Sequence, residues 1–119
     1  MAFVLNDRVK QTSTSTGTGT INLSATAETG FETFVAGIGD TNSTFYCISH
    51  DVTSYFEVGI GTVTDATPDT LARTTVLNKS LGTTAKINFS GTLDVFCTIS
   101  LSKWVYLFST VTSFGAASA

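Results

Sequence analysis

The feature that most constrains this chain is its abundance of β-branched residues. Threonine occurs 23 times among the 119 residues, together with ten valines and six isoleucines. Branching at Cβ restricts the side chain in a helix but fits the pleated surface of a sheet. We find no window of helical length in which apolar residues recur at a spacing of three and four. The sequence therefore predicts an all-β protein.

The length and the turn signals predict how those strands are organised. Strand-like segments recur at intervals of about 8–14 residues with Gly, Asn, Asp or Ser between them. A chain of 119 residues supplies one domain. We expect a single antiparallel β domain over residues 1–119, folded as a β-sandwich or flattened barrel. Residues 1–20 are an extended N-terminal arm or edge segment, and residues 21–119 form the β body.

The expected strand at residues 55–63 shows the clearest alternation. Phe56, Val58 and Ile60 fall on one face, and a glutamate and two glycines fall on the other. Because apolar side chains favour burial, we expect the first face to be the core. On this interpretation Val58→Asp unfolds the domain, since a buried unpaired carboxylate costs several kcal/mol.

Two glycines mark the opposite face of that strand. Gly59 and Gly61 lie two residues apart, which leaves a slot where a ring or another backbone can approach closely. We expect an aromatic ring in this slot, with Phe31 or Trp104 as the candidates. Gly59→Val then destabilises the protein by overpacking.

The N-terminal segment is the candidate partner-binding site. Phe3, Val4 and Leu5 are apolar, and Arg8 and Lys10 are basic. The tract that follows, residues 11–20, has little to bury on either face, so its register is weakly specified. An extended arm can add a strand to a neighbouring subunit, where Arg8 would pair with a carboxylate. The alternative is a first strand paired inside its own domain.

Composition and charge exclude several classes of protein. Only 13% of the residues are charged and the net charge is −3, which disfavours a nucleic-acid partner because phosphate binding needs clustered Lys and Arg. We find no signal peptide, and residues 104–119 fall short of the roughly 20 apolar residues that cross a bilayer. The sequence therefore predicts folding in the cytoplasm, with no membrane partner.

The chemistry-bearing residues do not assemble into a recognisable motif. His50, followed by Asp51, predicts a strand-end histidine more readily than a catalytic one. We expect Cys47 and Cys97 to be buried thiols, with a disulfide as the alternative. No metal-ligand spacing is present, so we predict no catalytic residue, no cofactor and no metal.

One further class uses aromatic side chains. Trp104, Tyr106 and Phe108 share a face and form either a platform for a sugar or part of the core. A glycan-processing enzyme would need two carboxylates facing a cleft, and Glu57 is the strand-borne acid best placed for that role.

Several sequence blocks, in order, resemble a module of tailed-bacteriophage virion proteins. The resemblance covers about residues 7–107, and its blocks lie at 7–10, 16–19, 30–31, 44–48, 56–62, 71–77, 87–91 and 95–96. The family usually carries a Tyr-Pro step after the last of these, where this chain has Ile99-Ser100-Leu101. In the family the module sits within longer tail-fibre or other virion chains.

The resemblance implies a non-enzymatic structural protein of the virion, assembled in the host cytoplasm. A free-standing module of this size suits a capsid decoration or cement protein that stabilises the head. Its expected partners are the major capsid protein or other virion subunits and further copies of itself, with a trimer favoured. The alternatives are a small tail or fibre-attachment component and, outside virions, a carbohydrate-binding module.

Overall fold

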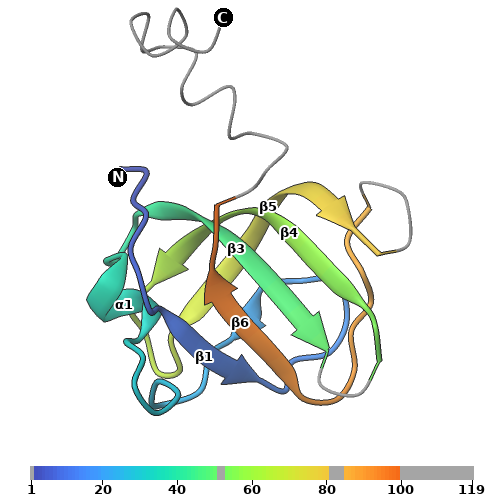
Figure 1. Ribbon diagram of the computed structural model, residues 1–119, viewed down its shortest axis with the longest axis horizontal. Helices are drawn as coiled ribbons and strands as arrows, with labels where there is room; N and C mark the ends of the chain where they lie inside the picture. The colour runs from blue at the N-terminus through green and yellow to red at the C-terminus, as the bar shows by residue number, and fades with distance from the viewer. Residues whose placement is uncertain (1, 51–52, 81–84, 100–119) are drawn as a thin grey trace, which may run out of the picture.

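The computed structural model describes residues 2–50, 53–80 and 85–99, and these form one antiparallel β domain (Figure 1). The strands follow the order β1-β6-β3-β4-β5-β2 across a single sheet. The all-β prediction is confirmed. The elements are β1 (Lys10–Ser13), β2 (Ile21–Asn22), α1 (Phe34–Gly37), β3 (Ser43–His50), β4 (Phe56–Thr64), β5 (Thr70–Lys79) and β6 (Leu93–Cys97).

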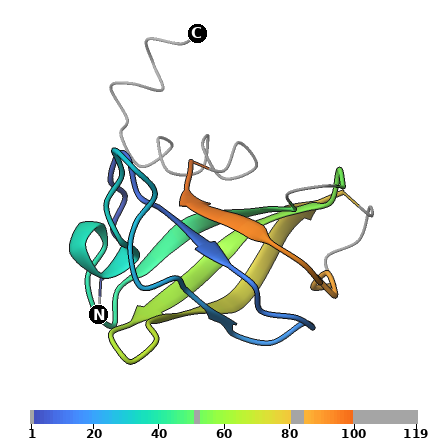
Figure 2. The same cartoon turned by 90° about the horizontal axis from the view of Figure 1, so that it is seen from below.

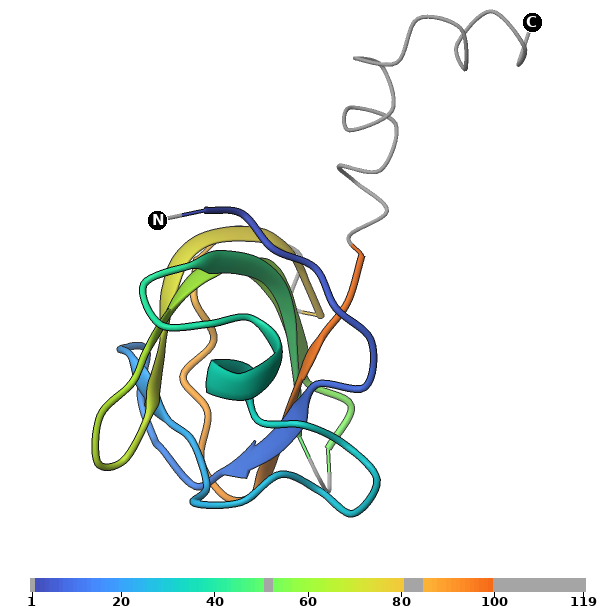
Figure 3. The same cartoon turned by 90° about the vertical axis from the view of Figure 1, so that its left-hand side faces the viewer.

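The sheet curls into a nearly closed barrel. The three longest strands, β3, β4 and β5, arch around α1 (Figure 3). Register shifts at Val58/Gly59 and Ile60/Gly61 increase the bend between β4 and β5. The two sheet edges meet because the Ser24 amide donates to the Thr12 carbonyl at 2.8 Å. The expectation of a flattened barrel is thus confirmed.

The helix α1 closes one end of the barrel, as Figures 1 and 2 show from two directions. Its N-cap is Thr33, whose hydroxyl accepts a hydrogen bond from the Ala36 amide at 3.1 Å. Phe34 and Ile38 are buried in the core. Four residues cannot form a stable helix alone, so this turn depends on the burial of those two side chains.

The core lies inside the barrel and contains residues from every strand except β1, together with loop residues. It is formed by Val9, Ile21, Leu23, Phe34, Ile38, Tyr46, Ile48, Val63, Leu71, Ile87, Phe89, Leu93 and Val95.

The expected core face of β4 points the other way. Phe56, Val58 and Ile60 are half-buried and lie outside the core cluster, whereas Glu57 and Val63 are fully buried. The prediction that Phe56, Val58 and Ile60 form the core is therefore wrong. Alternation separates the two faces of a strand but does not say which one the barrel encloses.

The glycine slot on β4 does hold an aromatic ring, but the ring is that of Tyr46. A Cβ added at Gly59 would lie 2.7 Å from Tyr46 Oη, and one at Gly61 would lie 3.2 Å from Tyr46 Cδ2. The two glycines therefore make room for a tyrosine on the neighbouring strand. The expectation of Phe31 is wrong, and Trp104 lies outside the described residues.

Candidate functional site

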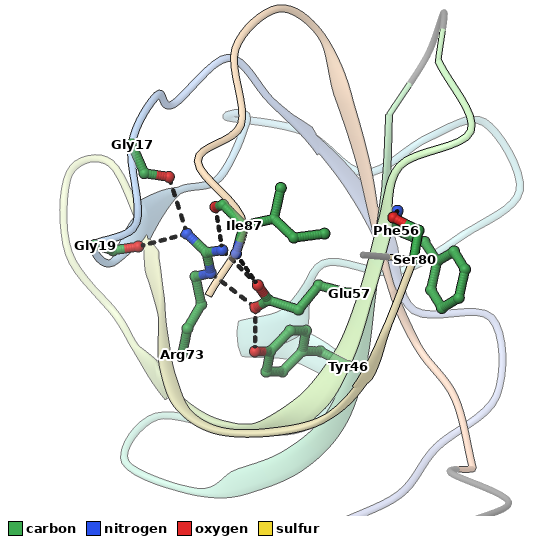
Figure 4. Close-up of polar contacts among 8 residues, drawn as sticks. All are labelled: Gly17, Gly19, Tyr46, Phe56, Glu57, Arg73, Ser80 and Ile87. Atoms are coloured by element: carbon green, nitrogen blue, oxygen red, sulfur yellow. Dashed lines mark hydrogen bonds and ion pairs between the residues drawn. The ribbon is translucent and has the colours of Figure 1, made fainter. Parts of the chain in front are cut away.

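The candidate site is built around a buried ion pair between Arg73 and Glu57 (Figure 4). Arg73 on β5 and Glu57 on β4 are joined by two hydrogen bonds, Nη2 to Oε1 at 2.6 Å and Nε to Oε2 at 2.9 Å. Both side chains are completely buried. The Tyr46 hydroxyl donates to Oε2 at 2.7 Å, and the Ile87 amide donates to Oε1 at 2.9 Å. Glu57 thus receives four hydrogen bonds.

Arg73 extends this network to the low-complexity N-terminal tract. Its Nη1 donates to the carbonyl oxygens of Gly17 at 3.1 Å and Gly19 at 3.3 Å, and its Nη2 donates to Ile87 at 2.7 Å (Figure 4). The guanidinium also lies over the Phe89 ring, 5.4 Å from its centroid. All five N–H groups of the guanidinium are therefore satisfied.

The electrostatics follow from burial and from these bonds. Burial by itself raises the pKa of Glu57, but hydrogen bonds from Arg73, Tyr46 and Ile87 and the arginine charge outweigh it, and the pKa lies below its usual range. Burial and the neighbouring carboxylate raise the pKa of Tyr46 well above its usual range. Glu57 is therefore ionised and Tyr46 is protonated at neutral pH.

This arrangement holds the fold together and leaves Glu57 no open lone pair for a substrate. In the described part of the chain, no buried side-chain nitrogen or oxygen lacks a hydrogen-bond partner. A glycan-processing enzyme would need Glu57 to face a cleft, but its side chain is fully buried. We identify the cluster of Tyr46, Glu57 and Arg73 as a structural centre, and we name it the buried polar cluster.

Gln11 on β1 is a second buried polar side chain with a full set of contacts to the backbone. Its Nε2 donates to the Ser24 carbonyl at 2.7 Å, and its Oε1 accepts from the Phe34 amide at 2.7 Å. The single amide thus joins β1 to the segment after β2 and to the start of α1. A lone glutamine in a Thr/Ser tract carries no sequence signal for this role.

The apolar residues of the predicted partner-binding segment lie along their own domain. Val4 donates its amide to the Ser43 carbonyl at 2.8 Å, which pairs the segment with the first residue of β3. The Phe3 ring meets Phe45 edge-on at 4.8 Å between centroids. Phe3 and Leu5 keep 44% and 37% of their surface exposed, and Val4 packs against the core. The segment is extended, as expected. It pairs with β3 of its own domain, which was the alternative to pairing with a neighbouring subunit.

The basic residues of that segment surround one aromatic ring. Arg8 lies over the Phe31 ring at 4.0 Å from the centroid, and Lys10 lies at 5.5 Å. The Arg8 Nε also donates to the Gly30 carbonyl at 3.2 Å, while its backbone has a φ of 60°. Lys10 begins β1 and pairs with Phe96 on β6. The binding of a partner by these five residues stays a prediction.

His50 is bound to the backbone through both ring nitrogens. Nδ1 accepts a hydrogen bond from the Thr53 amide at 3.1 Å, and Nε2 lies 2.5 Å from the Ser90 carbonyl. Because an amide can only donate, the ring proton lies on Nε2 and is donated to Ser90. This geometry agrees with the strand-end histidine that the sequence favoured.

The two cysteines are free and lie on opposite faces of the sheet. Cys97 packs against the core, and its Sγ lies 3.3 Å from the Thr44 hydroxyl. Cys47 pairs with Val58 on β4 and with Phe96 on β6, outside the core cluster. Burial raises the pKa of the Cys47 thiol to about 11. The expected inward position is therefore wrong for Cys47, and the disulfide alternative is wrong.

The sequence did not predict an apolar surface on these strands, because the alternation assigned Phe56, Val58 and Ile60 to the core. Cys47, Phe56, Val58, Ile60 and Phe96 are half-buried and lie together on the outside of β6, β3 and β4. Cross-strand pairing places Phe96, Cys47 and Val58 in one row. We name these five residues the outer apolar face. The alternation along β4 does separate this face from the buried one, but it does not indicate which of the two lies outside.

Other site types have little support in the part of the chain that the structure describes. No group of three or more His, Cys, Asp or Glu residues there is arranged to hold a metal ion. No helix there is long and apolar enough to cross a membrane. A hollow of about 300 Å³ lies between Leu5 and Ile99, and the ionisable side chains that line it are those of Asp7 and Cys97. The expected sugar platform at residues 104–108 lies outside the described residues.

The chain was compared with protein-family models, with curated proteins and with solved structures, and none of the three comparisons gave a match.

Proposed function

We propose that this protein is a non-enzymatic structural component of a bacteriophage virion, acting as a decoration or cement protein of the capsid. The observation that carries the proposal is the outer apolar face, where five apolar side chains of the central strands are only half-buried. Apolar side chains gathered on the outside of a small domain are typical of a protein that binds other proteins. The resemblance to phage virion modules is the reason for proposing that these other proteins are subunits of a virion.

The titratable groups support binding rather than chemistry. Among residues 2–50, 53–80 and 85–99, the groups with shifted pKa values are Tyr46, Glu57 and Cys47, and the first two are fully buried. A strongly shifted pKa in an open cleft would favour a catalytic role. A shifted pKa inside a network where every polar group has a partner favours a structural role. A decoration protein needs a stable fold and a surface for contacts with other subunits. The buried polar cluster is compatible with the first need, and the outer apolar face with the second.

The test is to measure the protein in purified particles. Quantitative gel densitometry of virions from a phage that encodes this chain should show hundreds of copies per particle for a head protein. A small multiple of three or six copies would favour the tail or fibre-attachment alternative. Absence of the chain from washed, intact particles would contradict the proposal.

The N-terminal residues can be tested in the same particles. Leu5→Asp changes an exposed side chain, so we expect the folded domain to melt as the wild type does. If the segment contacts a virion subunit, incorporation of this variant falls by at least about tenfold, which corresponds to about 1.4 kcal/mol. Thr18→Asp is the matched control, because Thr18 is exposed and lies away from this segment. Equal incorporation of both variants would contradict the assignment of this site.

A further inference from the structure

Residues 2–7 precede β1 and lie along the barrel as a strap. Ser43 holds the strap through two main-chain hydrogen bonds, from the Ser43 amide to the Ala2 carbonyl at 2.7 Å and from the Val4 amide to the Ser43 carbonyl at 2.8 Å. Two further hydrogen bonds join the strap to Asn42 and Gly37. Every residue of the strap except Val4 is exposed. A segment with few contacts and exposed hydrogen bonds opens more easily than the core does.

The strap ends at Arg8, where the chain becomes fixed in the barrel. The φ of Arg8 is 60°, a backbone conformation that few residues other than glycine adopt. Its guanidinium lies over the Phe31 ring, and its carbonyl accepts a hydrogen bond from the Glu32 amide at 2.6 Å. The next residue, Val9, is 2% exposed, and its carbonyl accepts from the Cys97 amide at 3.1 Å. Arg8 is therefore the boundary between a loosely held segment and a buried one.

The strap lies against Phe45. This side chain is on the outside of β3, because it pairs with Ile60 of the outer apolar face and lies outside the core cluster. Only 2% of its surface is exposed, whereas Ile60 beside it is half-buried. The Phe3 ring packs edge-on against Phe45, with 4.8 Å between the ring centroids. The strap thus covers an aromatic side chain that adjoins the outer apolar face.

We propose that the strap is a detachable cover: residues 2–7 leave the barrel as a unit, with Arg8 as the hinge, and uncover Phe45 while the barrel stays folded. The hydrogen bonds that break can be remade with water, so the burial of Phe45 and Val4 is what keeps the strap closed. Detachment also frees the apolar residues that the sequence predicts to bind a partner. Use of the uncovered surface by a virion subunit rests on the proposed function, whereas detachment is a property of the isolated chain.

The experiment is amide hydrogen exchange on the full chain, followed by NMR with increasing urea. The amides of Val4 and Ser43 are bonded across the strap, and the amide of Cys97 is bonded inside the barrel. If the strap detaches alone, protection from exchange at Val4 and Ser43 is at least about a hundredfold lower than at Cys97. Urea should have little effect on the first two, because detachment exposes little surface, and a large effect on the third.

A pair of variants tests what the strap covers. Phe3→Ala removes the ring against Phe45, and we expect protection at Val4 to fall by about a further tenfold, with more binding of the apolar dye anilinonaphthalene sulfonate. Leu5→Ala, at another exposed apolar residue of the strap, is the matched control and should change neither reading.

Equal protection of all three amides in the wild type would overturn the proposal, because strap and barrel would then open together. Equal behaviour of the two variants would also overturn it, since Phe45 would not be what the strap covers. The copy number in virions enters neither result, so this proposal and the proposed function fail independently.

Discussion

The inner and outer faces of the β3–β4 pair carry opposite chemistry. The inner face holds the Tyr46 ring, two glycines and the Glu57 carboxylate, while Cys47, Val58 and Ile60 lie outside. Burial of a charge is costly unless it is paired and fully hydrogen-bonded, and here every partner is present. The comparison teaches that completeness of pairing, and not polarity alone, determines which face a small barrel can enclose. Four predictions test this contrast.

The largest effect is expected from Glu57→Ala. The substitution leaves the Arg73 guanidinium buried without its carboxylate and removes the acceptor of the Tyr46 hydroxyl. We expect a loss of about 3–5 kcal/mol in the free energy of unfolding, against a usual total of about 5–15. Urea denaturation followed by circular dichroism measures it, and Glu32→Ala, at an exposed position, is the control. A loss no larger than that of the control would show that the ion pair is dispensable.

Gly59→Val is expected to have the next largest effect on the free energy of unfolding. A Cβ at this position meets both the Tyr46 hydroxyl and the backbone oxygen of Thr75, and the backbone cannot move aside cheaply. Overpacking of this kind costs about 1–3 kcal/mol despite the higher strand propensity of valine. Gly19→Val, where no atom lies within 4 Å of the added Cβ, is the matched control. Equal melting temperatures of the two variants would contradict the slot.

The third prediction concerns the stability of the folded protein at acidic pH. The pKa of Glu57 is lowered in the folded state, so its contribution to stability is fully present above the unfolded value of about 4.3. That contribution is lost as the pH falls through the folded pKa. We expect the free energy of unfolding, measured in urea between pH 7 and 2, to fall more steeply below pH 4.3 in the wild type than in Glu57→Gln. Parallel curves would assign the acid loss to other carboxyl groups.

The smallest effect is expected from Val58→Asp, which the sequence alone predicts to unfold the domain. Because Val58 is half-buried on the outer apolar face, the new carboxylate stays in contact with water. We expect a cooperative melt and a loss of about 1 kcal/mol or less. Val63→Asp, on the same strand but fully buried, is expected to unfold the protein. An unfolded Val58→Asp protein would mean that the outer face is a second core.

The residue types in the sequence predicted the fold class, but they could not predict which face of each strand is buried, and the reason is physical. The β-branched content and the turn spacing sufficed for an antiparallel barrel, because both act within a few residues of the chain. The inside of β4 was not predictable by the same means, because it depends on Tyr46, eleven residues away on another strand. The glycines at 59 and 61 indicated a ring but could not name it.

The candidate site was predicted less well than the fold. Arg73 stands out in the sequence as an interruption of a β-branched run, yet its partners come from three separate segments. The N-terminal residues were correctly expected to be extended, but their attachment through Val4 and Ser43 depends on main-chain atoms that no side chain signals. Contacts that join distant segments through the backbone leave no pattern in the sequence.

The attachment of the threonine-rich tract has a consequence for mutational tolerance. Arg73 holds this tract through the carbonyl oxygens of Gly17 and Gly19, and the side chains of Thr16, Thr18 and Thr20 point to no such partner and are exposed. Evolution and library selection can therefore vary these three side chains freely. The positive φ of 88° keeps position 17 for glycine. The tract is thus a place to graft new chemistry without redesigning the barrel.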